Sequence, residues 1–230
     1  MKKKQVFSTT IILILFLGAP TWASPLLVDW AFNDNGTVFS AADTSTNALP
    51  GHFNTDSFDW NTGLGNITLN YDAAGAYSFQ AFFDHEIVEG TNTYFNEYGE
   101  VHSAPADGQS WEIDEPGWVF GDIYDNLLAG NLDNLNGVPQ GSEDDVSFAM
   151  GWDFTLSVGE TALITLTLSE EVPQNFYLAQ VDPSGIHYFS SSLEIQSFPS
   201  PVPEPATILL FGTGLIGAVG IRFKNKGSSN

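Results

Sequence analysis

Apolar and polar residues alternate most regularly between residues 146 and 168. Apolar side chains recur at every second position over residues 146–156 and again over residues 162–168. This alternation is typical of strands that bury one face and expose the other. The intervening Val158-Gly159 favours a tight turn, because glycine can adopt a positive φ angle. The two segments are therefore predicted to form a β-hairpin.

Further segments are predicted to be strands, because their apolar residues alternate or form short runs bounded by turn residues. These segments are residues 26–32, 37–40, 66–71, 76–84, 175–181 and 186–195. Asn35-Gly36, between the first two, is a typical hairpin-turn sequence. We expect the more polar residues 41–65 and 87–117 to be irregular connections.

One helix is predicted, over residues 122–136. Asp122 can cap its N-terminus, apolar residues recur at helical spacing as far as Leu135, and Gly137 then favours termination. Many short strands with one short helix indicate an all-β fold. We expect an antiparallel, jelly-roll-like β-sandwich over residues 24–198.

The N-terminal segment has the three regions of a secretory signal peptide. Basic residues at positions 2–4 precede an apolar run at residues 6–17, and a small-residue cleavage site ends at Ala23. We expect cleavage between Ala23 and Ser24, so that residues 1–23 form a signal peptide read by the secretion machinery. A retained membrane helix is the alternative interpretation.

A second apolar segment, residues 206–221, contains no charged residue. About 16 helical residues span roughly 24 Å, somewhat less than the ~30 Å hydrocarbon core. Arg222, Lys224 and Lys226 follow it and can snorkel to the membrane surface. We predict a transmembrane helix with a basic cytoplasmic tail over residues 222–230. A buried core helix is the alternative.

The C-terminal region as a whole resembles the PEP-CTERM sorting signal of bacterial surface and extracellular-matrix proteins. Pro203, Glu204 and Pro205 match the motif within a Pro-rich linker over residues 199–205, and the apolar segment and basic cluster follow in the expected order. The exported region resembles those of other such proteins only loosely.

This resemblance implies a partner and a route. In the family, a membrane protease called exosortase is thought to recognise and process the tail. The protein would be anchored transiently in the inner membrane and would then reach the cell surface or the extracellular matrix. Because the signal occurs on unrelated exported regions, it carries no information about what this region binds.

Charge is segregated along the chain. All six Lys and Arg residues lie in the two terminal segments, whereas all 28 Asp and Glu residues lie between Lys4 and Arg222. The carboxylates in between must be solvated, hydrogen-bonded, protonated or neutralised by a metal ion or partner. This field repels nucleic acid and suits cations or a hydrated polysaccharide. The sequence contains no Cys, so no disulfide stabilises the domain.

Five acidic residues are candidate calcium ligands, because calcium prefers carboxylate oxygens. Three of them are adjacent and precede a predicted strand, and the other two lie in the predicted helix. They are Glu143, Asp144, Asp145, Asp122 and Asp125. No EF-hand loop is present, and a solvated acidic turn is the alternative interpretation.

Two other groups contain residue types that occur in active sites. The first combines carboxylates with histidine, as zinc and calcium sites do, but its spacing matches no zinc motif. It comprises Asp84, His85, Glu86, Glu89, Glu97, Glu100 and His102. The second combines carboxylates with tryptophan, as glycosidases do. It comprises Trp111, Glu112, Asp114, Glu115 and Trp118.

The sequence contains no G-x-S-x-G motif, cysteine nucleophile or glycine-rich phosphate loop. We therefore expect an exported, non-enzymatic cell-surface or extracellular-matrix protein. A carbohydrate- or calcium-binding surface module is the alternative, and a polysaccharide hydrolase is the third hypothesis. The orientation of Trp111, Trp118 and Trp152 should distinguish them, because a sugar site needs exposed aromatic rings.

Overall fold

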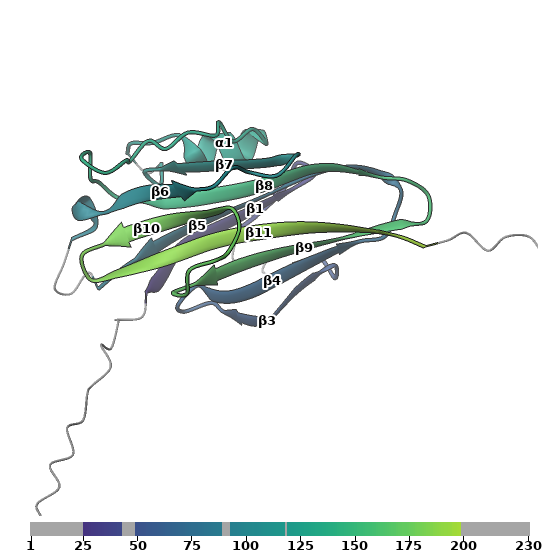
Figure 1. Ribbon diagram of the computed structural model, residues 1–230, viewed down its shortest axis with the longest axis horizontal. Coiled ribbons are helices and arrows are strands. Elements are labelled where there is room, and N and C mark those ends of the chain that lie inside the picture. The colour runs from purple at the N-terminus through teal and green to yellow at the C-terminus, as the bar shows by residue number, and fades with distance from the viewer. Residues whose placement is uncertain (1–24, 43–48, 89–92, 118, 199–230) are drawn as a thin grey trace, which may run out of the picture.

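The computed structural model describes residues 25–42, 49–88, 93–117 and 119–198. Its strands form two antiparallel sheets (Figure 1). The five-stranded sheet has the order β2 (Thr37–Ser40), β1 (Leu26–Asp34), β5 (Gly75–Glu86), β8 (Ser147–Leu156) and β7 (Gln109–Asp114). The six-stranded sheet has the order β3 (Phe53–Asp59), β4 (Leu64–Tyr71), β9 (Glu160–Ser169), β11 (Gly185–Ser197), β10 (Tyr177–Asp182) and β6 (Tyr98–His102).

The main hydrophobic core joins the two sheets. On β5, Phe79, Ala81 and Phe83 alternate along the strand and pack in one buried cluster with side chains of the six-stranded sheet, including Ile164 and Phe189. Alternate side chains of a strand point to opposite faces, so the period-2 pattern of the sequence corresponds to this buried face. The all-β, two-sheet prediction is confirmed.

Both strands predicted over residues 146–168 form, but the predicted hairpin does not, because the two strands belong to different sheets and do not pair with each other. β8 pairs with β5 and β7, whereas β9 pairs with β4 and β11. The connection around Gly159, which has a φ of 86°, therefore crosses from one sheet to the other. Local alternation identified both strands, but it could not indicate which strands pair.

The helix is shorter than predicted. α1 spans Ile123–Ala129 and ends at Gly130, whose backbone is left-handed with a φ of 70°. Asp122 occupies the N-cap position, but its side chain makes no capping hydrogen bond. Leu132 is buried against the helix, whereas Leu135 is 62% exposed. The apolar spacing beyond residue 130 therefore belongs to a loop, because the glycine ends the helix first.

α1 covers the outer face of the five-stranded sheet (Figure 1). Ile123 and Leu127 pack there against Ala31, Phe82 and Ala149. This contact explains why β8 is buried on both faces along much of its length, although its sequence pattern predicted one exposed face. It also brings the start of the helix next to β7.

β3, β6 and β7 lie in segments that we predicted to be irregular, so that expectation is wrong there. All three are edge strands. The predicted signal peptide, Pro-rich linker, transmembrane helix and basic tail lie outside the described residues. Within the described ranges, no helix combines the length and the apolar character that a membrane crossing needs.

Candidate functional site

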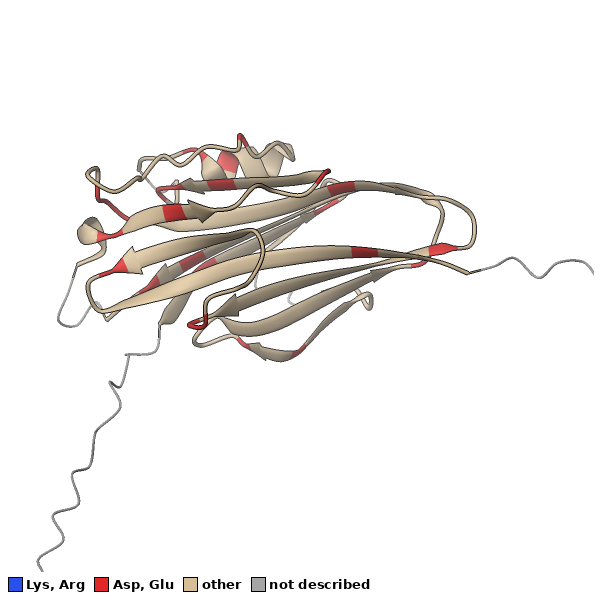
Figure 2. Cartoon of the chain, in the orientation of Figure 1, with Lys and Arg blue, Asp and Glu red and all other residues tan. Residues whose placement is uncertain are grey.

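The described part of the chain is acidic throughout and contains no Lys or Arg (Figure 2). Within these residues, His52 Nε2 lies 2.9 Å from Asp34 Oδ2 and forms an ion-pair contact with it. Because the described residues offer these carboxylates no Lys or Arg, groups of acids that approach one another are candidate sites for protons or cations.

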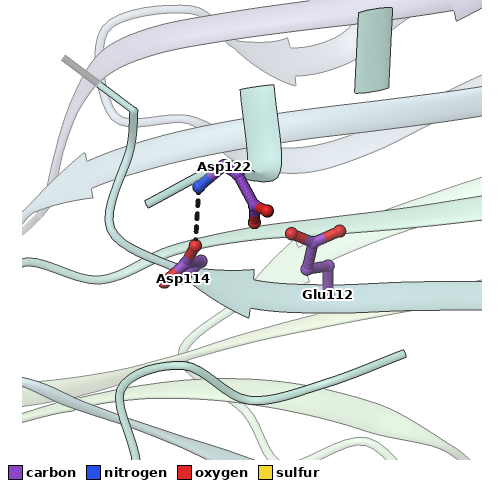
Figure 3. A group of neighbouring side chains, drawn as sticks. All are labelled: Glu112, Asp114 and Asp122. Atoms are coloured by element: carbon purple, nitrogen blue, oxygen red, sulfur yellow. Dashed lines mark hydrogen bonds between the residues drawn. The ribbon is translucent and has the colours of Figure 1, made fainter. Parts of the chain in front are cut away.

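One such group lies where β7 meets the start of α1. Glu112 and Asp114 are two residues apart on β7 and therefore share a face, and Asp122 immediately precedes the helix. One carboxylate oxygen from each lies within 4.8 Å of the others. Figure 3 shows the Asp122 carboxylate pointing toward that of Glu112. We call this group the β7–α1 carboxylates.

Hydrogen bonds fix these side chains. Glu112 Oε1 accepts from Asn126 Nδ2 and Glu112 Oε2 accepts from the Asp133 backbone N–H, both at 3.0 Å. Asp114 Oδ2 accepts from the Asp122 backbone N–H at 2.8 Å. Because Asn126 belongs to α1, these bonds attach the helix and the loop after it to β7.

Burial dominates the electrostatics of this group. Glu112 is 1% exposed, and burial raises its pKa to about 7, although the bonds from Asn126 and Asp133 lower it. Burial also raises the pKa of Asp114, against the hydrogen bond from the Asp122 backbone. Chemically, the group can hold a proton near neutral pH or offer three carboxylates to a hard cation such as calcium.

The structure brings Asp122 together with Glu112 and Asp114 and not with the other four predicted calcium ligands. Asp125 is exposed on α1, and Glu143 Oε1 accepts a hydrogen bond from the Gly141 backbone at 2.9 Å. Asp144 Oδ1 accepts from the Asp145 backbone N–H at 3.0 Å. The calcium role of the Glu143–Asp145 turn stays a prediction. The sequence analysis named Glu112 and Asp114 only as glycosidase-type carboxylates and not as partners of Asp122, because β7 was not predicted.

The histidine-containing group does not converge as a whole, because Asp84 and Glu86 line one pocket and the histidines lie elsewhere. The His85 ring faces the six-stranded sheet, with Nε2 3.3 Å from the Gly63 carbonyl oxygen and the ring centroid 6.2 Å from that of His187. Burial lowers the pKa of His85 to about 3 and that of His187 to about 4. His102 instead stacks on Tyr177 at the edge strand β6. Glu89 lies outside the described residues, and no histidine joins a metal-type cluster among the described ones.

The two marker tryptophans within the described residues, Trp111 and Trp152, form no exposed platform. Trp152 is 5% exposed and donates from Nε1 to Ser191 Oγ at 3.0 Å, and Trp111 packs against the main core. Trp118 lies outside the described residues. A different aromatic pair, Trp30 and Trp60, has ring centroids 4.8 Å apart and lines a cavity of about 510 Å³. A sugar ring could stack there.

Comparison with known proteins bears on the C-terminal region. A family model described as the PEP-CTERM protein-sorting motif matches residues 201–225. The match includes the Pro203-Glu204-Pro205 motif and the apolar segment, which the sequence analysis connected with this signal. No curated protein and no solved structure matches the chain.

Proposed function

We propose that this chain, which carries the PEP-CTERM sorting signal at residues 201–225, is a non-enzymatic component of the bacterial cell surface or extracellular matrix. The signal implies export and processing by exosortase, a membrane protease. The match over residues 201–225 is the observation that carries the proposal. In this account residues 1–23 are removed as a signal peptide and residues 206–221 cross the membrane until the tail is processed.

The charge of the described domain suits a location in a hydrated matrix. It contains no Lys or Arg, so its charge keeps it soluble and repels other anionic surfaces. The jelly-roll-like character of the fold remains part of this proposal. The two sheets contain five and six strands, more than the eight strands of a simple jelly roll.

The proposal predicts that exosortase recognises the three motif residues. Replacing Pro203, Glu204 and Pro205 together by Ala in the native host should leave a full-length form in the membrane. Pro199→Ala, just before the matched segment, is the matched control and should be processed normally. Immunoblots of membrane and extracellular fractions would measure this. Unchanged processing of the triple variant would refute recognition through this motif.

Calcium binding is the second candidate function, and the β7–α1 carboxylates are the observation that favours it. Glu112, Asp114 and Asp122 place three carboxylate groups within reach of one ion. No Lys or Arg in the described residues competes for them. A bound calcium ion would offset the repulsion among these acids and would hold α1 against β7.

A further inference from the structure

A second acidic site lies at one end of the five-stranded sheet. There β5 and β7 end, β8 begins, and the short 3-10 helix η1 (Tyr94–Asn96) packs nearby. These elements enclose a pocket with a volume of about 350 Å³, which lies within the range of small-ligand sites. We call it the β5-end pocket. It is distinct from the β7–α1 carboxylates, none of which lines it.

Four acids line the β5-end pocket: Asp84, Glu86, Glu115 and Asp145. Asp84 is 2% exposed, and its Oδ1 atom accepts no hydrogen bond from any described residue. A buried polar atom without a partner costs free energy, and a charged one costs more. The pocket is therefore lined by a buried carboxyl group with an oxygen to which no described residue donates.

The neighbouring strand increases this cost. Asp29 on β1 lies directly opposite Asp84 in the strand register, next to a bulge between Leu27 and Asp29. Like charges directly opposite each other destabilise a sheet. Burial, with Asp145, Glu86 and Asp29 nearby, holds the pKa of Asp84 well above its usual range. The geometry and the charges both favour a cation beside Asp84.

The remaining lining is apolar and unusually exposed. Val28, Tyr94, Phe95, Val119 and Phe120 all line the pocket, and Phe95 and Phe120 are 58% and 67% exposed. Exposed apolar side chains gathered at one place mark binding surfaces, and aromatic rings attract organic cations through their faces. The apolar part of the lining can therefore contact an apolar group of the same ligand that carries the cation.

The spacing of the acids distinguishes between kinds of cation. Within the described residues, only Glu112, Asp114 and Asp122 form a group of three acids close enough to share one metal ion. The acids of the β5-end pocket form no such group. Acids spread around an aromatic-lined cavity suit a larger cation with several N–H donors. We propose that the β5-end pocket binds an organic ammonium group carried on an apolar stem.

The test uses the full chain in a nonionic detergent and saturation-transfer NMR, which detects protons of a bound ligand. The probes are n-butylammonium, uncharged n-butanol and Nα-acetyl-lysine methylamide, and the last represents a lysine side chain. We expect n-butylammonium to bind and n-butanol not to bind. Tighter binding of the lysine derivative would identify a lysyl residue as the source of the ammonium, and weaker binding a free amine.

Three variants locate the site. Asp84→Asn should weaken n-butylammonium binding about tenfold, because it removes the charged acceptor. Phe120→Ala changes an exposed side chain, so it should fold normally, and it should weaken binding about fivefold. Asp56→Asn, an exposed acid on β3, should change nothing. The proposal would be overturned if n-butanol bound as well as n-butylammonium, or if the Asp84 and Asp56 variants had equal effects. It would also be overturned if calcium, but not sodium at equal ionic strength, displaced n-butylammonium.

Discussion

Glu97 lies fully buried just before β6 and accepts a hydrogen bond from Gln180 Nε2 at 2.6 Å. Gln180 Nε2 also donates to the His85 carbonyl oxygen at 2.6 Å. Burial raises the pKa of Glu97 to about 9, although the bond from Gln180 lowers it and nearby acids raise it further. At neutral pH the Glu97 side chain is therefore a neutral acid, and Gln180 joins it to the end of β5.

This residue predicts a pH dependence of stability. The folded protein keeps a proton on Glu97 that the unfolded chain releases above its ordinary pKa of 4.5. The stabilisation is therefore complete below about pH 4.5 and is lost as the pH rises toward 9. We expect Glu97 to make the wild-type free energy of unfolding fall between pH 5 and pH 9. Glu112 should add to this fall between about pH 4.5 and 7. Below about pH 6.5 the two buried histidines, His85 and His187, act in the opposite direction, because burial lowers their pKa values.

Glu97→Gln should flatten the pH dependence, because a neutral amide can still accept the hydrogen bond from Gln180. The substitution should remove up to about 1.4 kcal/mol per pH unit from the slope and make the variant more stable than wild type at pH 9. Urea unfolding at pH 5, 7 and 9 measures this. Glu194→Gln, at an exposed position, is the control. Parallel curves for wild type and Glu97→Gln would contradict the buried neutral acid.

At the scale of elements, the sequence predicted the strands that contribute regularly to the core. The alternation along residues 146–156 and 162–168 corresponds to β8 and β9, because each has a face in the main cluster. The edge strands β3, β6 and β7 were missed because an edge strand has one neighbour and can carry a more polar pattern. The helix was overextended because Leu132 and Leu135 happen to continue its spacing.

The β7–α1 carboxylates could not be predicted for the same reason. Their convergence depends on β7 being an edge strand beside β8 and on α1 folding back over the sheet. Neither arrangement is encoded in local periodicity. The sequence did indicate that acids would lack basic partners, and Asp122 was correctly placed at the start of the helix. It could not indicate that Glu112 and Asp114 would be the acids beside it.

The β7–α1 carboxylates lead to a prediction about calcium and stability. Millimolar calcium should raise the melting temperature of the full chain in detergent more than sodium chloride at the same ionic strength, since a specific ion acts at low concentration. Each kcal/mol of binding free energy corresponds to about 2–4 °C in a domain of this size. Asp114→Asn combined with Asp122→Asn should abolish the difference. Glu170→Gln combined with Glu171→Gln, at exposed positions, should retain it.

Two outcomes would count against this site. Equal shifts from calcium and matched sodium would mean that the acids are screened without a specific site. A calcium effect that survives in the β7–α1 variant but disappears when Glu143, Asp144 and Asp145 are replaced would place the ion at the turn that the sequence pattern suggested. Differential scanning calorimetry resolves both.

At the scale of the whole molecule, the basic residues lie in the terminal segments that the proposed export route would remove. The chain has a formal net charge of −22, and its six basic residues lie in the terminal segments. Removal of residues 1–23 and of the basic tail would leave a product without Lys or Arg. Such a product would repel other anionic surfaces and would be neutralised mainly by cations from its surroundings. The account therefore depends on both ends being processed.

The most direct test is the intact mass and terminal sequence of the protein recovered from outside native cells. The account predicts a single form that begins at Ser24 and lacks the basic residues Arg222, Lys224 and Lys226, with the described domain complete. Recovery of a form that still begins at Met1, or that retains residues 222–230 and stays in the membrane fraction, would contradict export through the PEP-CTERM route.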